Sequence, residues 1–284
     1  MVKLGLLYDQ LRPDERLIIE AAKRDGIDLT LYDTDQLAWD VTSQDDGIEL
    51  ADAFLQRCIS YFRSIHVTAA LEGRGKTVVN SYRASSTCGN KLIASIALSR
   101  ENIPTPRTFV AFTQDGSLKA LERLGYPAVL KPIVGSWGRL VAQLKDPETA
   151  TAILEPREYM HPIQQVYYLQ EKIKRPERDI RCYVIGDQAV AAIYRNAPPG
   201  EWRTNTARGG VAENLAVTPE LSEISVRAAE AVGGGAFGVD LMETDSGFVV
   251  HEVNHTTEFK NTVRVTGVDI PKLLLQYTID QVKA

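Results

Sequence analysis

The stretch that decides the fold is FGVDLMETDSGFVVHEVN, residues 237–254. Both halves are apolar and rich in β-branched side chains, as strands are, and the polar residues between them predict a three-residue hairpin loop at residues 245–247. Centring that loop on Ser246 places Asp240 directly opposite Glu252. The stretch therefore predicts two carboxylates side by side on one face of an antiparallel strand pair.

Asn254 is expected on the same face as Glu252, because side chains two residues apart in a strand point the same way. Two carboxylates that face each other repel unless a cation lies between them. Carboxylate and amide oxygens suit magnesium. The pattern thus predicts a magnesium site at Asp240, Glu252 and Asn254, with an exposed hairpin as the alternative. His251 alternates to the other face and is excluded from this site, whereas His255 adjoins it.

Length and composition describe an ordinary globular protein. The chain has 284 residues, of which 44% are hydrophobic and 24% charged, so it is long enough for two or three sub-domains with sizeable cores. A net charge of -5 argues against nucleic-acid binding through a general basic surface. We therefore expect no nucleic-acid partner.

The cysteines and the N-terminus bear on the compartment. Cys58, Cys88 and Cys182 are odd in number, far apart and without a CxxC pair, so they predict neither a disulfide framework nor a zinc site. The apolar run at residues 1–8 is too short for a signal peptide or a membrane span. These features favour a protein of the reducing cytoplasm with no membrane partner.

The chain divides into three segments by pattern. A strand–helix–strand order followed by a second such unit predicts a small parallel-sheet domain at residues 1–88. A helix at residues 88–100 leads into a proline-bounded linker, and the mixed pattern beyond it predicts a central α+β lid domain at residues 89–166. Longer strands and the hairpin predict a C-terminal α+β domain at residues 167–284. The expected fold class is therefore α/β (α+β).

A glycine-containing turn follows Lys131, which ends an apolar strand. Such a turn can lay backbone amides against phosphate oxygens while the lysine adds a point charge. The loop residues expected to bind the nucleotide with Lys131 are Gly135, Ser136, Trp137 and Gly138. An ordinary surface turn is the alternative.

A polar strand end lies at residues 170–173 and offers main-chain groups to an adenine, with an acid for the ribose hydroxyls. The nucleotide-binding candidates in this region are Gln170, Glu171, Lys172, Ile173, Asp179 and Arg181. Polar strand ends are common, so a plain strand end is the alternative.

A loop rich in anion donors, WRTNTARGG, occupies residues 202–210. Arg203 in this loop is suited to neutralising a transferring phosphoryl group or an acyl phosphate. The alternative is a solvated surface loop.

The order of these features resembles that of the ATP-grasp ligases along nearly the whole chain. The matching positions are Lys91, Lys131, the 135–139 loop, the 170–173 strand end, Asp179-Ile-Arg181, Arg203-Thr-Asn205, Asp240 and Glu252-Val-Asn254. The resemblance implies an ATP-grasp fold that binds ATP between the middle and C-terminal segments, with Lys91 and Lys131 on its phosphates. It also implies two magnesium ions at the carboxylate site and catalytic roles for Arg203 and Asn205.

Within that superfamily the chain resembles the group containing the ribosomal-protein glutamate ligase. It is more similar still to the family that joins α-aminoadipate to the amino-group carrier protein LysW in lysine biosynthesis, through RTNTARGG at 203–210 and EVNHTTEFKN at 252–261. This resemblance implies ligation through an acyl phosphate on the C-terminal glutamate of the carrier, and a homodimer or homotetramer. By position, the residues implied for substrate binding are Arg195, Asn205, Thr206, Asn254, His255, Thr256 and Thr257.

Other readings remain open. A ligase that attaches glutamate to the same carrier, or a bifunctional form, differs by one methylene in its substrate, which is worth only about 1–3 kcal/mol of discrimination. A ribosomal-protein-type glutamate ligase is a second alternative. A non-catalytic ATP-binding module is a third, against which the full set of Arg203, Asn205 and the metal residues argues.

Overall fold

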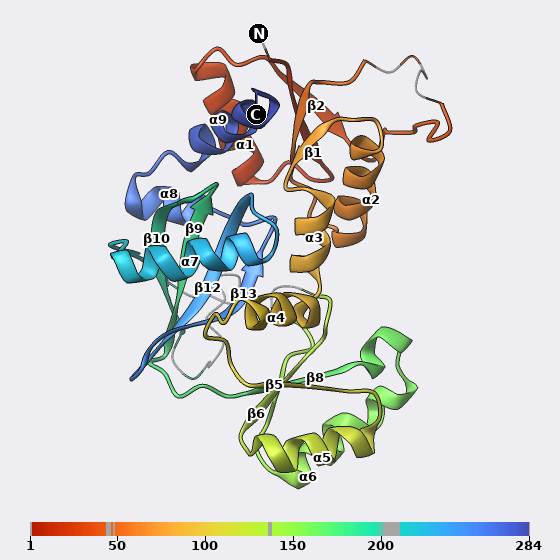
Figure 1. The fold of residues 1–284 in the computed structure, drawn as a ribbon, viewed down its shortest axis with the longest axis vertical. Coiled ribbons are helices and arrows are strands. Elements are labelled where there is room, and N and C mark those ends of the chain that lie inside the picture. The colour runs from red at the N-terminus through yellow and green to blue at the C-terminus, as the bar shows by residue number, and fades with distance from the viewer. Residues whose placement is uncertain are drawn as a thin grey trace.

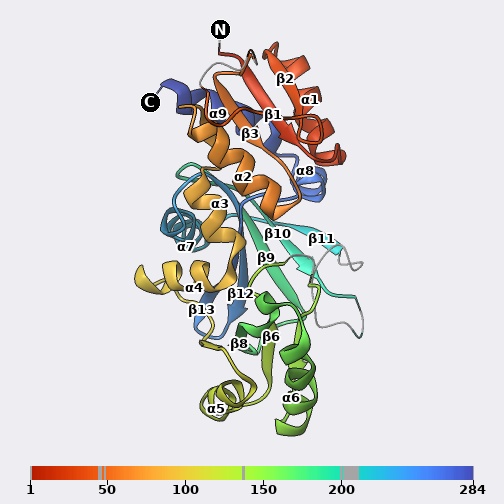
Figure 2. The same ribbon diagram turned by 90° about the vertical axis from the view of Figure 1, so that its right-hand side faces the viewer.

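A computed structural model describes residues 2–43, 47, 49–135, 138–198, 200 and 211–283. Three β-sheets stack along the long axis of the molecule, the first at the end that holds both termini (Figure 1). The view turned by 90° shows the same three tiers from another side (Figure 2). Among the described residues, no helix is long and apolar enough to cross a membrane.

The N-terminal sheet is parallel, with the strand order β2-β1-β3-β4, as the opening pattern predicts. Its elements are β1 (Leu4–Tyr8), α1 (Pro13–Arg24), β2 (Leu29–Asp33), β3 (Ala53–Gln56), α2 (Tyr61–Glu72) and β4 (Thr77–Val79). The helix predicted from residue 88 is instead two helices, α3 (Tyr82–Gly89) and α4 (Lys91–Arg100). Asn90 divides them, because its side chain accepts hydrogen bonds from the amides of Leu92 and Ile93 and so caps α4.

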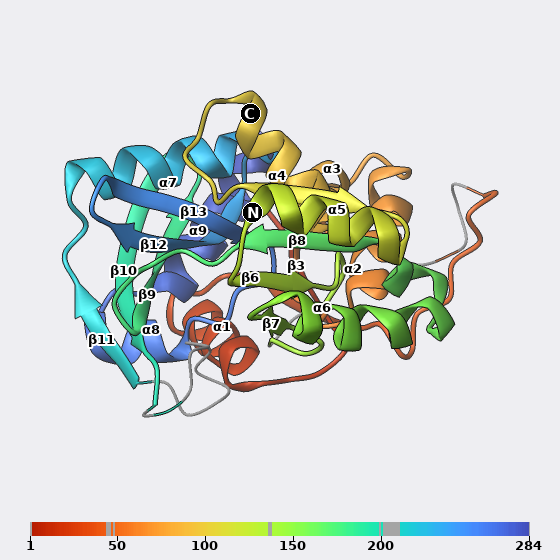
Figure 3. The same cartoon turned by 90° about the horizontal axis from the view of Figure 1, so that it is seen from below.

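The middle sheet has the order β5-β8-β6-β7 and is antiparallel. Its elements are β5 (Thr108–Ala111), α5 (Gln114–Leu124), β6 (Ala128–Lys131), β7 (Ala142–Leu144), α6 (Pro147–Leu154), the short 3₁₀ helices η1 (Glu155–Tyr159) and η2 (Pro162–Gln165), and β8 (Tyr167–Glu171). Helices α5 and α6 lie along its outer side and pack on it through Leu121 and Leu154 (Figure 3). The pattern assigned β8 to the third segment, but β8 pairs with β5 and β6, so we propose that the middle domain extends through Glu171.

The C-terminal sheet is antiparallel with the order β11-β10-β9-β12-β13. Its elements are β9 (Arg178–Ile185), β10 (Gln188–Asn196), β11 (Val211–Leu215), α7 (Pro219–Ala231), β12 (Ala236–Thr244), β13 (Gly247–Asn254), α8 (Lys260–Thr266) and α9 (Ile270–Lys283). Helix α7 covers one face, where Leu221 and Ala228 pack against Val239 and Leu241. Helix α9 returns to the N-terminal sheet, so that the first and last elements share one core (Figure 1).

The hairpin of β12 and β13 confirms that Asp240 pairs with Glu252, but the predicted loop is wrong. The two strands pair from Thr244 and Gly247 onwards, so the loop holds two residues rather than three. A register shift after Asp240 leaves His251 as an extra residue in β13. This β-bulge restores the alignment that the shorter loop would have lost by one residue.

Candidate active site

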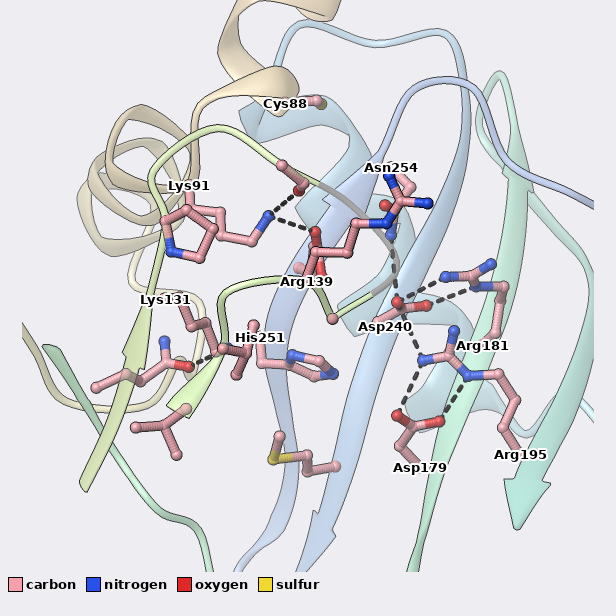
Figure 4. Close-up of a pocket in the computed structure, with 18 of the residues that line it drawn as sticks. Cys88, Lys91, Lys131, Arg139, Asp179, Arg181, Arg195, Asp240, His251 and Asn254 are labelled. Carbon is pink, nitrogen blue, oxygen red and sulfur yellow. Dashed lines mark hydrogen bonds and ion pairs between the residues drawn. The ribbon is translucent and has the colours of Figure 1, made fainter. Parts of the chain in front are cut away.

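A cleft of about 590 Å³ lies between the middle and C-terminal sheets. The middle sheet and its loops contribute Lys131 and Gly135, while the C-terminal sheet contributes Asp240 and Glu252. The start of α4 adds Lys91, which lies near the loop (Figure 4). Arg12 and Tyr61 of the first segment line it as well, so residues from all three sequence segments meet in one cavity.

Asp240 lies at the floor of this cleft and is only 2% exposed. Arg181 donates from Nε to Oδ1 at 2.7 Å and from Nη2 to Oδ2 at 2.8 Å, and Nη2 of Arg195 lies 3.0 Å from Oδ2 (Figure 4). Burial alone would raise the pKa of Asp240, but the charges of Arg181 and Arg195 hold that pKa well below its usual range. The carboxylate is therefore ionised at neutral pH and held by two fixed cations.

Glu252 is neutralised differently from its cross-strand neighbour. Nζ of Lys91 lies 3.0 Å from its Oε1 and also donates to the carbonyl oxygen of Gly135 at 2.8 Å. Burial would raise the pKa of Glu252, and the charge of Lys91 lowers it below its ordinary value. A single lysine thus ties this carboxylate to the glycine loop.

Lys131 ends β6 inside the cleft and donates to Oε1 of Gln170 at 2.6 Å. Burial lowers the pKa of Lys131 to about 8, against an ordinary value of 10.5, although Glu252 opposes the shift. A phosphate group beside it would favour the charged form. Lys131 is therefore suited to binding an anion that enters the cleft.

The polar strand end forms one wall of the cleft, which Gln170, Glu171, Lys172 and Ile173 all line. The amide of Gln170 is used internally, since its Nε2 donates to the hydroxyls of Thr108 and Tyr168. Oε1 of Glu171 accepts from the backbone amide of Arg107 at 2.6 Å. These contacts fix the strand end against the rest of the middle sheet.

His251, which the pattern placed on the opposite face from Glu252, lines the cleft. The β-bulge turns it towards the same cavity as Asp240, where it lies between Lys131 and the arginines (Figure 4). Both ring nitrogens are shielded from solvent and make no hydrogen bond among the described residues. Burial, together with the charge of Lys131, lowers the pKa of His251 to about 4, so the ring is neutral at pH 7. No local sequence signal marks a bulge at this position.

The far end of the cleft is formed by the turn after β13 and by the start of α1. His255, Thr256 and Thr257 line it, and Thr257 packs so closely on Gly238 that a Cβ there would lie 2.5 Å from its Cγ2. Burial and the charge of Arg57 lower the pKa of His255 to about 4. This end combines hydroxyl groups with a neutral imidazole.

Arg12, which the pattern did not single out, also lines this end. It donates to Glu15 from Nε at 2.9 Å and from Nη2 at 2.8 Å, while Nη1 is 3.4 Å from Glu258. Asp14 accepts hydrogen bonds from the backbone amides of Phe259 and Lys260, so the start of α1 is bonded to the turn that follows β13. Arg12 and Glu258 are 246 residues apart in the chain, so the sequence alone does not predict their contact.

The other predicted site residues fall into two groups. Gly135, Gly138, Asp179, Arg181, Arg195 and Asn254 line the cleft, whereas Ser136, Trp137, Arg203, Asn205 and Thr206 lie outside the described residues. Arg195 was expected to bind a substrate carboxylate, yet it is 3% exposed and is paired with Asp179 and Asp240.

The three cysteines offer no nucleophile. All are free and buried, and burial raises the pKa of Cys58 to about 12 and that of Cys182 to about 11. Burial likewise raises the pKa of Cys88 at the cleft wall. A thiol in such surroundings stays protonated and unreactive at neutral pH.

The donor set at the hairpin fits magnesium bound together with phosphate. No cluster of three or more His, Cys, Asp or Glu side chains able to hold a metal occurs in the described part of the chain. Asp240 and Glu252 supply carboxylate oxygens, and Asn254 donates from Nδ2 to Asp240 at 3.2 Å, which leaves its amide oxygen for another partner. Magnesium usually takes one or two carboxylates and completes its shell with water and phosphate oxygens, so this sparse set is the appropriate one.

Comparison with known families shows which proteins resemble this chain. The model of the RimK-like ATP-grasp domain matches residues 88–278, and that of the LysX preATP-grasp domain matches residues 4–87. The chain belongs to the RimK-like ATP-grasp ligases. The expected ATP-grasp fold and the ATP-dependent joining of a carboxylate to an amine are thereby confirmed.

Individual ATP-grasp ligases match over nearly their full length. Alpha-aminoadipate--LysW ligase LysX of Saccharolobus solfataricus is 38% identical over 96% of this chain and 99% of its own. Glutamate--LysW ligase ArgX of Sulfolobus acidocaldarius is 34% identical over 97% of this chain and 98% of its own. The solved RimK domain protein of Sphaerobacter thermophilus is 26% identical, with a TM-score of 0.76 over 98% of this chain and 99% of that one.

Proposed function

We propose that this ATP-grasp ligase joins the α-amino group of α-aminoadipate to the γ-carboxyl group of the C-terminal glutamate of the carrier protein LysW, forming ADP and phosphate. The observation that carries the proposal is the 38% identity to a LysX ligase over 96% of the chain. The cleft supports it, because acidic, basic and hydroxyl-bearing side chains meet there in a space large enough for a nucleotide and a second reactant.

In this proposal ATP lies along the cleft wall. Lys91 and Lys131 bind its phosphates, with the glycine loop at residues 135–138 against them. The strand end at residues 170–173 offers main-chain groups to the adenine. Lys91 already contacts both Gly135 and Glu252, so one side chain lies within reach of both the phosphate loop and the acidic hairpin.

Asp240, Glu252 and Asn254 would hold two magnesium ions. When bound, magnesium neutralises charge on the phosphate oxygens and helps to orient the γ-phosphoryl group. Arg181 and Arg195 keep Asp240 ionised for this role, and Lys91 does the same for Glu252. The carboxylates are therefore charged before any nucleotide enters.

The chemistry needs no covalent nucleophile from the protein. The carrier carboxylate attacks the γ-phosphorus of ATP, which releases ADP and leaves an acyl phosphate. The amine of α-aminoadipate then attacks the acyl carbon and displaces phosphate, forming the amide. We assign stabilisation of the transferring phosphoryl group to Arg203, assisted by Asn205.

The amino acid would bind at the far end of the cleft. Asn205, Thr206 and the turn from Asn254 through Thr257 are the proposed contacts. To these we add Arg12. Among the described residues, its Nη1 donates only to Glu258, at the long distance of 3.4 Å. A guanidinium at this point suits a substrate that carries two carboxylates.

A second candidate is attachment of glutamate to the same carrier, since ArgX of Sulfolobus acidocaldarius is 34% identical over 97% of the chain.

We also propose a homodimer or homotetramer that works in the cytoplasm. Three free cysteines, all buried, fit a reducing compartment.

Mass spectrometry of LysW tests the function. LysW is incubated with the enzyme, ATP and magnesium, and with either α-aminoadipate or glutamate. The proposal predicts a mass increase by one aminoadipate residue that requires ATP, and little increase with glutamate at equal concentration. A preference for glutamate would establish the second candidate, and no modification despite ATP binding would contradict both.

A further inference from the structure

Asp240, the proposed magnesium ligand, belongs to one of two charged pairs that lie close together on β12, β9 and β10. Arg181 faces Asp240 across β9 and β12, and Arg195 faces Asp179 across β10 and β9. Asp179 and Arg181 are two residues apart, so both point to the cleft face of the sheet. The register therefore builds a row of four alternating charges across three strands.

The pair of Arg195 and Asp179 is buried and joined by two hydrogen bonds. Arg195 donates to Asp179 from Nε at 2.6 Å and from Nη2 at 2.9 Å, and Arg195 and Asp179 are 3% and 2% exposed. Nη2 of Arg195 also lies 3.0 Å from Oδ2 of Asp240. Buried ion pairs contribute little net stability compared with apolar residues of similar size, so packing alone does not explain the arrangement.

The hydrogen bonds distinguish the two oxygens of Asp240. Oδ2 accepts hydrogen bonds from Nη2 of Arg181 at 2.8 Å and from Nδ2 of Asn254 at 3.2 Å, and Nη2 of Arg195 lies 3.0 Å from it as an ion-pair contact. Oδ1 accepts only from Nε of Arg181 among the described residues, at 2.7 Å. Since a carboxylate oxygen has two lone pairs, Oδ2 is saturated and Oδ1 keeps capacity for a cation.

We propose that Arg195, held by Asp179, is a positioning residue that presents Oδ1 of Asp240 to the magnesium accompanying the nucleotide, and is not a ligand of the amino-acid substrate. The inference rests on the proposed function in that it takes Asp240 as a magnesium ligand. Outer partners of this kind orient metal ligands, and their loss typically lowers metal affinity 10- to 100-fold.

The chain contains a matched control. Arg178 and Glu243 lie on the same two strands as Arg181 and Asp240 and form a similar fork, with Nε to Oε2 at 2.8 Å and Nη2 to Oε1 at 3.3 Å. Neither residue lines the cleft. Arg178→Gln therefore removes an arginine–carboxylate pair of similar geometry, although a more exposed one, without touching the candidate site.

The test measures ADP binding by calorimetry at a series of magnesium concentrations. We expect Arg195→Gln to raise the magnesium concentration needed for half-maximal enhancement of ADP binding about 10- to 100-fold. ADP affinity without magnesium should stay within about twofold, and so should the KM for the amino acid. Arg195→Lys, which keeps the charge and loses the fork, should recover only part of the magnesium affinity. Arg178→Gln should leave all of these quantities unchanged.

A second variant guards against misfolding, because Arg195→Gln removes a cation that is hydrogen-bonded to the buried carboxylate of Asp179. The double variant Arg195→Gln with Asp179→Asn removes both charges and should show the same shift in magnesium dependence. A raised KM for the amino acid with unchanged magnesium dependence would overturn the proposal and make Arg195 a substrate ligand. Unchanged values in both variants would show that the pair is merely structural.

The KM requires LysW and the amino acid, but the ADP-binding measurements require neither, so the magnesium dependence of ADP binding is separable from the outcome for the proposed function. If the wild type binds ADP in a magnesium-dependent way but does not modify LysW, the proposed function fails and the role of Arg195 is still decided. If its ADP binding is independent of magnesium, Asp240 is not a magnesium ligand and the inference is overturned.

Discussion

Asp240 and Glu252 face each other on one hairpin, yet their surroundings differ. Asp240 lies in the sheet and is bonded by Arg181 and Arg195, whose backbones belong to neighbouring strands. Glu252 pairs with Lys91 from α4, and that lysine also donates to the carbonyl oxygen of Gly135 in the glycine loop. One carboxylate is neutralised by the rigid sheet, and the other by a flexible side chain that joins two other parts of the molecule.

This difference changes the expectation drawn from the hairpin alone. Two opposed carboxylates suggest mutual repulsion that a metal must relieve. The structure shows instead that the protein supplies cations of its own to both acids. Asp240 is therefore held by two arginines of its own sheet, whereas Glu252 has a lysine partner from another part of the molecule.

The largest expected effect concerns Asp240. Asp240→Asn leaves Arg181 and Arg195 without their shared carboxylate, and breaking a buried ion pair typically costs about 3–5 kcal/mol of folding free energy. Denaturant unfolding without magnesium measures this loss. A variant as stable as the wild type, or more so, would mean that repulsion from Glu252 outweighs the two arginines.

Glu252→Gln should separate catalysis from stability. Its side chain is 26% exposed and has a lysine partner, so the free energy of unfolding should fall by less than the roughly 3–5 kcal/mol expected for the more deeply buried Asp240. The magnesium concentration needed for half-maximal activity should rise by more than the roughly 10- to 100-fold shift expected for outer partners. Titration of activity with magnesium checks this, and an unchanged requirement would remove Glu252 from the metal site.

Lys131 should make nucleotide binding depend on pH. With a pKa of about 8, only about a tenth of the protein carries the charged lysine at pH 9, so ADP affinity should fall by up to about tenfold between pH 7 and pH 9. Stability should move the other way, because the unfolded chain binds more protons than the folded one between pH 8 and the ordinary pKa of 10.5. Calorimetry across this range tests the affinity, with Lys131→Gln as the control whose weaker binding should not vary with pH.

The smallest effect is expected at His251. His251→Leu replaces two buried ring nitrogens that make no hydrogen bond to the described part of the chain, so the free energy of unfolding should stay the same or rise. If the ring bonds the nucleotide, ADP affinity should fall by the roughly 0.5–1.5 kcal/mol that one hydrogen bond contributes. Equal ADP affinity in both proteins would leave His251 as a lining residue only.

Local patterns predicted the parts of the site that are set by neighbouring residues. The hairpin can be derived because a short turn fixes strand register, although a shorter loop and a β-bulge compensate for one another to give the pairing of Asp240 with Glu252. The parallel opening sheet also follows from its strand–helix–strand order. Such features depend on contacts within a few tens of residues.

Contacts between distant segments could not be predicted in this way. Lys91 meets Glu252, and Arg12 meets Glu258, only because α4 and α1 pack against the C-terminal sheet and its following turn. The pairing of β8 with the middle sheet depends on the fold, since its sequence suits either neighbouring sheet. The buried partners of Arg195 likewise become visible only once three strands are aligned.

The most direct test of the account is hydroxylamine trapping with enzyme, ATP, magnesium and LysW but no amino acid. If the cleft activates the carrier carboxylate, a hydroxamate should form at the C-terminal glutamate of LysW and be detected by mass spectrometry. Glu252→Gln should greatly reduce it at the same magnesium concentration. Absence of a hydroxamate on LysW, or its formation on α-aminoadipate when that amino acid is supplied, would contradict the account.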